Sequence, residues 1–151
     1  MSRRKANRIG IDAVSDIPSG FVPARFSPGF LDHAGPYYLK DQQGKFMVAC
    51  RVGAHHMNYV DTAHGGVLTT LADVALSWAV YNSEVPNRAV STVSLTTNFL
   101  SGVHLGDWIE GAAIIDRIGK NLAYVHGSIS CRDRVVMTMS GVFKLIRSKA
   151  A

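Results

Sequence analysis

The feature that most constrains the fold is the segment 66–80, which is typical of a helix with apolar side chains in almost every direction around its axis. Its polar side chains Thr69, Asp73 and Ser77 are four residues apart and share one narrow stripe. A helix of this kind needs cover on every side. An aspartate is almost never fully buried unless it is paired or has a chemical task. The sequence therefore predicts a buried central helix over residues 65–82 that carries one functional acid.

Composition and charge exclude several other classes of protein. The chain has 151 residues, of which 47% are hydrophobic and 18% charged, a balance typical of one globular domain. The net charge is +5, but the first ten residues hold four of the 16 basic residues and no acid. We expect residues 1–29 to be a flexible basic tail and an irregular lead-in. Because the remainder is nearly neutral, no nucleic-acid-binding face is predicted.

Localisation is inferred from the apolar segments and the cysteines. No apolar run reaches the roughly 18 residues of a membrane span, and no signal-peptide core lies near the start. Cys50 and Cys131 are isolated and lack Cys-x-x-Cys spacing. This pattern indicates free buried thiols in a reducing compartment, so we expect a cytoplasmic protein.

The remaining segments indicate strands. Residues 1–45 contain four prolines and are expected to be irregular, apart from a helical turn at 30–33. Apolar residues alternate in the later segments, which predicts strands at 46–52, 93–99, 108–116, 122–131 and 135–145. Val93, Leu95, Thr97 and Phe99 are expected on one face, as are Val135, Met137, Met139, Gly141, Phe143 and Leu145. Short polar connections at 101–107, 119–121 and 132–134 predict hairpins, and therefore an antiparallel meander.

The predicted fold class is α+β, with a curved antiparallel sheet wrapped around the long helix. One sheet covers only part of a helix that is apolar nearly all round. We therefore expect a second subunit to supply the remaining cover.

The order of elements and motifs resembles that of the hotdog-fold acyl-CoA thioesterases of the phenylacetate-pathway type. The resemblance covers about residues 30–147 and includes Asn58, His64-Gly65-Gly66 and Asp73 around the helix start, followed by the strand 92–100. It implies a single hotdog domain over residues 30–151. The sequence departs from the family pattern at Leu100-Ser101-Gly102, where the family usually has Leu-Arg-Pro.

The resemblance also implies roles for individual residues. The main oxyanion donor is then the Gly65 N–H, with His64 and Asn58 positioning the carbonyl or the water, while Thr92 faces Asp73. Backbone N–H groups of Gly65 and Gly66 at a helix N-terminus suit a developing oxyanion. Asp73 is either the base that activates water or the nucleophile that forms a mixed anhydride, and the sequence leaves both open. Loop hydrogen bonding is the structural alternative for Asn58 and His64.

Helix geometry adds a constraint on the site. Gly65 and Asp73 are eight residues apart in the sequence, which is about 12 Å along a helix. One carbonyl cannot reach both groups within a single helix. An antiparallel helix of a second subunit would bring the two groups together, giving two shared sites in each homodimer. We expect a dimer of dimers.

The substrate contacts are predicted in two places. By resemblance, the hairpin 117–123 lies near the nucleotide of coenzyme A, and cations there suit phosphates. The candidate coenzyme A contacts are Arg117, Gly119, Lys120, Asn121 and Arg88. Walls of the acyl pocket, for an aromatic or medium-chain acyl group, are expected from Phe30, Tyr37, Tyr38, Trp78 and Tyr81.

Other functions remain as alternatives. No cofactor is expected, because coenzyme A is part of the substrate. A metal site at His55, His56 and His64 would lack completing ligands other than Asp61, and no metal is predicted. A Gly-x-Ser-x-Gly motif is absent from the sequence. The competing functions are a hotdog enoyl-thioester hydratase or dehydratase and a non-catalytic acyl-CoA-binding protein.

Overall fold

The long helix lies in the concave face of one curved antiparallel sheet. The computed structural model describes residues 16–83 and 88–147, so the basic N-terminal tail lies outside the described residues. Within these ranges the helices are α1 (Phe30–Ala34) and α2 (Gly65–Tyr81), with a 3-10 turn, η1 (Ala54–His56). The strands are β1 (Val22–Ala24), β2 (Tyr37–Gln42), β3 (Lys45–Arg51), β4 (Arg88–Phe99), β5 (Trp108–Ile118), β6 (Leu122–Cys131) and β7 (Arg134–Arg147).

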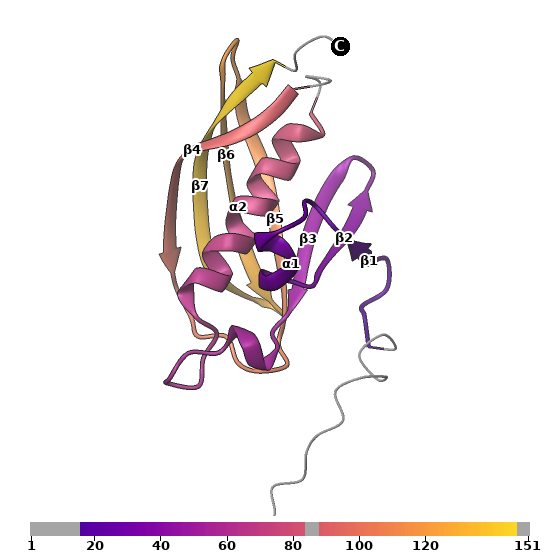
Figure 1. Cartoon of the computed structure of the whole chain (residues 1–151), viewed down its shortest axis with the longest axis vertical. Helices are drawn as coiled ribbons and strands as arrows, with labels where there is room; N and C mark the ends of the chain where they lie inside the picture. The colour runs from indigo at the N-terminus through magenta and orange to yellow at the C-terminus, as the bar shows by residue number, and fades with distance from the viewer. Residues whose placement is uncertain (1–15, 84–87, 148–151) are drawn as a thin grey trace, which may run out of the picture.

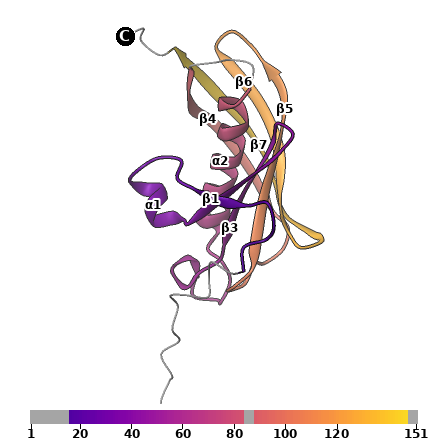
Figure 2. The same cartoon turned by 90° about the vertical axis from the view of Figure 1, so that its right-hand side faces the viewer.

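The helix α2 packs against the sheet through a fully apolar stripe. Leu68, Leu71, Ala75 and Leu76 of α2 are almost completely buried. Figure 1 shows α2 running across β4 to β7, and Figure 2 shows the sheet on one side of α2 and α1 on the other. This confirms the predicted hotdog architecture, an α+β fold with one long central helix. None of the helices within the described residues is long and apolar enough to cross a membrane.

The strand order corrects the predicted meander. In the described residues, seven strands form one sheet in the order β1-β2-β3-β5-β6-β7-β4. The connection 101–107 is therefore not a hairpin, because it carries the chain from the β4 edge across to β5 in the middle of the sheet. The hairpins predicted at 119–121 and 132–134 are confirmed, since β5 pairs with β6 and β6 with β7.

The N-terminal region is more regular than predicted. The short α1 was expected, but Val22–Ala24 and Tyr37–Gln42 are paired strands in a region that we expected to be irregular. Proline occupies the centre of β1 and the residue before β2. These prolines interrupt the alternation of apolar and polar residues by which a strand is predicted from sequence. The segment 22–42 is thus part of the sheet and of the cover over α2.

Two β-bulges change the predicted strand faces. The β4–β7 register shifts between Thr92 and Ser94, so Val93 leaves the alternation and is 59% exposed. The β6–β7 register shifts beside Val136, which is buried while Val135 is exposed. A bulge inserts one residue and reverses the alternation on one side of it, so Val135 does not share the face of Met137 as predicted.

The two cysteines lie on one row of the sheet. Cys50 of β3 is paired with Ile109 of β5, which is paired with Cys131 of β6. Both thiols are buried and free, as predicted. Two strand spacings separate them by about 10 Å, which is beyond the reach of a disulfide.

Candidate active site

The acid of α2 is held by a hydroxyl from the edge strand β4. Asp73 is half-buried, and Thr92 Oγ1 donates a hydrogen bond of 2.6 Å to its Oδ1. Two of the nearby hydroxyls of the helix bond elsewhere, since Thr70 donates to the Gly66 carbonyl and Ser77 to the Val74 carbonyl. Within residues 16–83 and 88–147, no hydrogen bond reaches Asp73 Oδ2. The carboxylate therefore keeps one oxygen available for chemistry.

A hollow of about 800 Å³ opens beside Asp73. Asp73, Ser77 and Trp78 of α2 form one wall. The predicted wall residues Phe30 and Tyr81 also line it. The predicted wall residues Tyr37 and Tyr38 do not, and they line a separate hollow of about 350 Å³. Sequence reasoning missed the remaining lining, which consists of Arg25, Phe26, Ser27, Pro28, Leu31, Val74, Ala89 and Val90.

The N-terminus of α2 presents one open backbone donor. His64 is the N-cap residue, and its Nδ1 accepts a hydrogen bond of 2.9 Å from the Gly66 N–H. Gly66 is therefore not a free oxyanion donor, contrary to the expectation that both glycines would contribute. In the part of the chain that the structure describes, the Gly65 N–H meets no acceptor. It borders a second hollow of about 350 Å³ that Phe99 also lines.

The His64 ring has a defined tautomer in this arrangement. Since Nδ1 accepts a hydrogen bond, the neutral ring carries its proton on Nε2. The ring is exposed, so that Nε2–H can donate to a group outside the helix. His64 thus has both a capping contact and a free donor.

Asn58 shapes the loop before α2. Its Oδ1 accepts hydrogen bonds from the Val60 and Thr62 N–H groups, and its Nδ2 donates to Thr62 Oγ1. The geometry therefore agrees with the structural alternative of loop hydrogen bonding. Asn58 fixes the turn that leads into the helix N-terminus.

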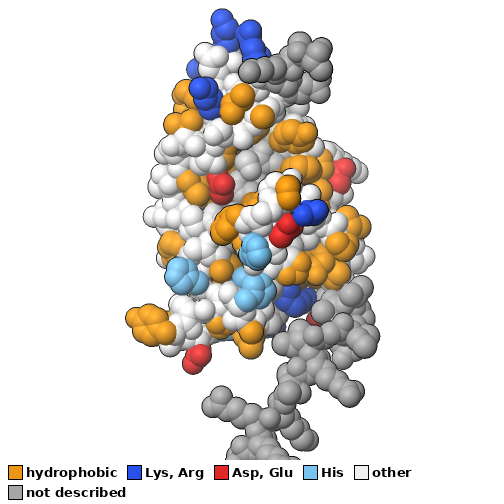
Figure 3. Space-filling view, in the orientation of Figure 1, with side chains coloured by type: hydrophobic (Ala, Val, Ile, Leu, Met, Phe, Trp, Pro, Cys, Tyr) orange, Lys and Arg blue, Asp and Glu red, His pale blue; other side chains and the backbone are white. Residues whose placement is uncertain are grey.

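The five predicted coenzyme A contacts come together at the β5–β6 turn. Arg117, Gly119, Lys120 and Asn121 line a shallow hollow of about 610 Å³. Arg88, at the start of β4, joins them because its Nη1 donates to the Lys120 carbonyl at 2.8 Å. Figure 3 shows Lys and Arg side chains gathered at this end of the molecule. The cluster presents cations beside exposed backbone, which suits a polyanion.

Comparisons with known proteins decide the family. The thioesterase superfamily profile matches residues 60–138, which include Gly65, Asp73 and Thr92. The chain belongs to the thioesterase superfamily. This thioesterase is 37% identical over 131 residues to a Pseudomonas aeruginosa protein named as a candidate esterase, covering 86% of this chain and 98% of that protein.

Solved structures support the same assignment for the fold. A Bacillus halodurans protein solved with coenzyme A is similar with a TM-score of 0.67 and 25% identity, over 74% of each chain. The E. coli PaaI protein from the phenylacetic acid degradation operon gives a TM-score of 0.65 and 24% identity, over 73% of this chain and 78% of that one. The protein is a thioester hydrolase with a hotdog fold of the PaaI type.

Proposed function

We propose that this thioesterase hydrolyses aromatic or medium-chain acyl-CoA thioesters at sites shared between two subunits. The observation that carries the proposal is that Asp73 is held by the Thr92 hydroxyl and lines a hollow of about 800 Å³. Coenzyme A as the carrier is supported by the cation cluster at the β5–β6 turn and by the similar Bacillus halodurans protein solved with coenzyme A.

Hydrolysis requires an activated oxygen and a polarised thioester carbonyl. Asp73 either takes a proton from the attacking water or attacks the carbonyl carbon itself. In the first case a C–O bond forms to water, the C–S bond breaks, and the thiol leaves with the proton that Asp73 took from the water. In the second case the carboxylate displaces the thiolate to form a mixed anhydride, and water then hydrolyses the anhydride to the free acid and restores Asp73. The hydrogen bond from Thr92 fixes the orientation of the Asp73 carboxylate, and so also the direction of its other oxygen. The Gly65 N–H, with the helix dipole behind it, stabilises the oxyanion.

The two groups must come from different chains to act on one carbonyl. Both lie on α2 (Gly65–Tyr81), and eight residues of helix separate them by about 12 Å. A two-fold axis that makes two α2 helices antiparallel sets Asp73 of one subunit against the Gly65 N–H of the other. His64 Nε2–H would then assist the same carbonyl or the attacking water.

The activity test measures free thiol released from a panel of acyl-CoAs. We expect release by the wild type and a loss of at least about a thousandfold for Asp73→Ala. Acyl-CoA binding without thiol release would instead indicate a non-catalytic binding protein. Hydration of an enoyl-CoA without hydrolysis would indicate a hydratase.

The shared-site test mixes two inactive proteins. Asp73→Asn removes the acid, and Gly65→Pro removes the backbone donor. Proline is tolerated at the first position of a helix, and His64 has the extended ψ of 138° that a residue before proline requires. After subunit exchange in a 1:1 mixture, half of the dimers are hybrids and each hybrid has one intact site, so about a quarter of wild-type activity returns.

Subunit exchange is the control for this experiment. We would monitor exchange by native mass spectrometry of differently tagged chains, in which the homodimer signals decrease as hybrids form. If exchange is complete and thiol release stays at the level of the separate variants, Asp73 and Gly65 do not meet across subunits.

A further inference from the structure

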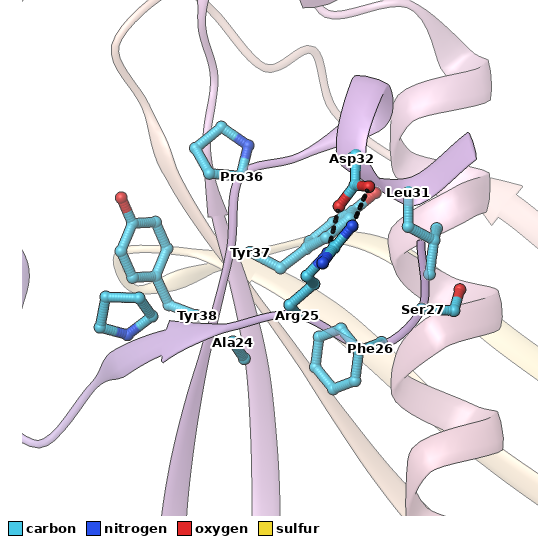
Figure 4. A pocket seen from close by; sticks show the side chains of 10 residues that line it. Ala24, Arg25, Phe26, Ser27, Leu31, Asp32, Pro36, Tyr37 and Tyr38 are labelled. Carbon is cyan, nitrogen blue, oxygen red and sulfur yellow. Dashed lines mark hydrogen bonds and ion pairs between the residues drawn. The ribbon is translucent and has the colours of Figure 1, made fainter. Parts of the chain in front are cut away.

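The hollow beside Asp73 and the hollow lined by Tyr37 share part of their lining at the segment 25–27, which follows β1. Both are lined by the same four residues, Arg25, Phe26, Ser27 and Leu31. Phe26 contributes a half-buried ring to this segment, whereas Arg25 and Ser27 are exposed. Figure 4 shows the Phe26 side chain on this segment and the Leu31 side chain on α1. The Phe26 ring, with Leu31, is thus an apolar wall that the two spaces share.

Aromatic contacts hold this ring in place from both sides. Phe26 packs edge-on against Trp78 of α2, with ring centroids 4.9 Å apart. It also packs edge-on against Tyr37 of β2 at 6.1 Å. Trp78 lines the hollow beside Asp73, and Tyr37 lines the other hollow. The wall therefore has one aromatic neighbour from each hollow.

The backbone that carries Phe26 is closed into a loop by an ion pair. The Arg25 guanidinium donates to both oxygens of Asp32, from Nε at 2.9 Å and from Nη2 at 2.8 Å. Asp32 also accepts from the Gly29 N–H. Figure 4 shows this bidentate pair joining the segment to α1. A planar, two-bond contact of this kind fixes the position of the segment next to the hollow.

The region around Phe26 contains two unsatisfied polar groups. Within the described residues, Tyr37 Oη and Trp78 Nε1 are buried side-chain atoms without a hydrogen-bond partner. Burial also raises the pKa of the Tyr37 hydroxyl. Both side chains pack on Phe26, so the ring lies between a buried indole N–H of the larger hollow and a buried hydroxyl of the smaller one.

We propose that Phe26 is a specificity-determining residue that sets the maximum length of the acyl group. The acyl chain extends from Asp73 past Ser77 and Trp78 and stops at the Phe26 ring. Removal of the ring joins the hollows of about 800 Å³ and 350 Å³ into one longer pocket. This inference rests on the proposed acyl-CoA thioesterase function and goes beyond it by assigning the end of the pocket.

The test compares kcat/KM across straight-chain acyl-CoAs of increasing length. Two acyl-CoAs are compared, the shortest one that the wild type rejects as too long and the best wild-type substrate. For Phe26→Ala we expect the kcat/KM of the first, divided by that of the second, to rise by about tenfold or more. Phe26→Trp should shift the preference toward shorter chains. The matched control is Phe46→Ala, since Phe46 also packs edge-on against Trp78, at 6.2 Å, but lines neither of the two hollows. Its preference should match that of the wild type.

The outcomes separate this inference from the proposed function. If the wild type releases thiol but Phe26→Ala, Phe26→Leu and Phe26→Trp keep the wild-type length preference, the inference is wrong. A uniform loss of activity at every length, with folding intact by circular dichroism, also overturns it. If the wild type releases no thiol, the proposed function fails, and the length dependence of acyl-CoA affinity, measured by calorimetry for the same variants, decides the role of Phe26.

Discussion

At the scale of single residues, Thr92 and Asp73 form the contact on which the proposed chemistry depends. Their hydrogen bond of 2.6 Å joins an edge strand to the central helix. The bulge directly after Thr92 changes the alternation of β4, so Leu95 and Thr97 lie on its inner face instead of Ser94 and Thr96. The bulge therefore lets Thr92 and Leu95 both face α2, although they are an odd number of positions apart in the strand.

Thr92→Val should reduce catalysis more than stability. The change keeps the shape of the side chain but removes the donor, so the Asp73 carboxylate loses its orientation. We expect kcat to fall by about 10- to 100-fold with little change in KM, and Tm to stay close to that of the wild type because Thr92 is exposed. Thiol release and thermal unfolding measure the two effects.

Thr96→Val is the matched control for that variant. Thr96 lies on the same strand, is also exposed, and faces away from α2. Its kcat should remain at the wild-type value. An equal loss of activity in both variants would mean that β4 is disturbed as a whole and that the Thr92 hydroxyl has no specific role.

At the scale of elements, the η1 turn fastens the end of α1 to the body of the protein. His56 is almost fully buried; its Nδ1 accepts a hydrogen bond from the Gly53 N–H, and its Nε2 donates one of 2.6 Å to the Ala34 carbonyl. The His55 ring lies against it at a tilt of 39° and donates from Nε2 to the Gly35 carbonyl. Two imidazole rings therefore hold the end of α1 in place.

This attachment predicts that acid destabilises the protein. Burial lowers the pKa of His56 below 6.5, so the folded state favours the neutral ring. The stabilisation is complete above the unfolded pKa and is lost as the pH falls below 6.5 toward the folded pKa. We expect the free energy of unfolding to decrease between pH 7.5 and pH 5, and His56→Gln to decrease less over that range, as measured with urea.

The matched control is His33→Gln, which removes a histidine that is exposed at the end of α1. It should keep the pH dependence of the wild type. If His56→Gln also keeps it, protonation of His56 is not the cause.

The sequence predicted the elements with strong periodicity and missed those without it. The helix expected at 65–82 is observed as Gly65–Tyr81, and the five expected strands are all present. β1 and β2 were missed because prolines interrupt their short patterns. The position of β4 at the sheet edge could not be predicted, since a connection of seven residues can close a hairpin or cross a sheet. The bulges beside Val93 and Val136 add single residues that composition does not mark.

The site residues that the family resemblance names could be predicted from the sequence. The contacts that depend on a side-chain rotamer or on the path of a loop were harder to predict. Asp73 and Thr92 were expected to face each other, and their side chains are in contact. The capture of the Gly66 N–H by His64 depends on the His64 rotamer, which the sequence does not encode directly. Phe26 was missed because the segment around it was predicted to be irregular, and its partners Trp78 and Tyr37 are distant in sequence. The catalytic roles of all these residues stay predictions.

At the scale of the whole molecule, α2 is covered by the sheet on one side and only partly by α1 on the other. Val67, Thr69 and Thr70 near its N-terminus remain half-buried in a single chain. Among the described strands, β4 is paired on one side only. These features leave room for the second subunit that the proposed shared site requires.

A chain that carries both Asp73→Asn and Gly65→Pro should lower the activity of wild-type chains with which it forms dimers. Each hybrid dimer would then have one site without the acid and one without the backbone donor, so both sites fail. In a fully exchanged 1:1 mixture, activity per wild-type chain should fall to about half, because half of the wild-type chains are in hybrids. The assay is thiol release against mixing ratio.

Independent sites give a different result in the same experiment. Each wild-type chain would then keep its full activity at every ratio. The Thr96→Val chain serves as the inert partner, since its hybrids with the wild type should show no loss.

The row of Cys50, Ile109 and Cys131 has a practical consequence for labelling chemistry. Burial raises the pKa of the Cys50 thiol to about 12, so almost none of the reactive thiolate is present at neutral pH. Cys131 is equally enclosed in the sheet. A single cysteine introduced at an exposed position such as Ile114, which is 61% exposed, should react alone with a maleimide or spin probe. The native chain can therefore carry one chosen probe without first being stripped of its own thiols.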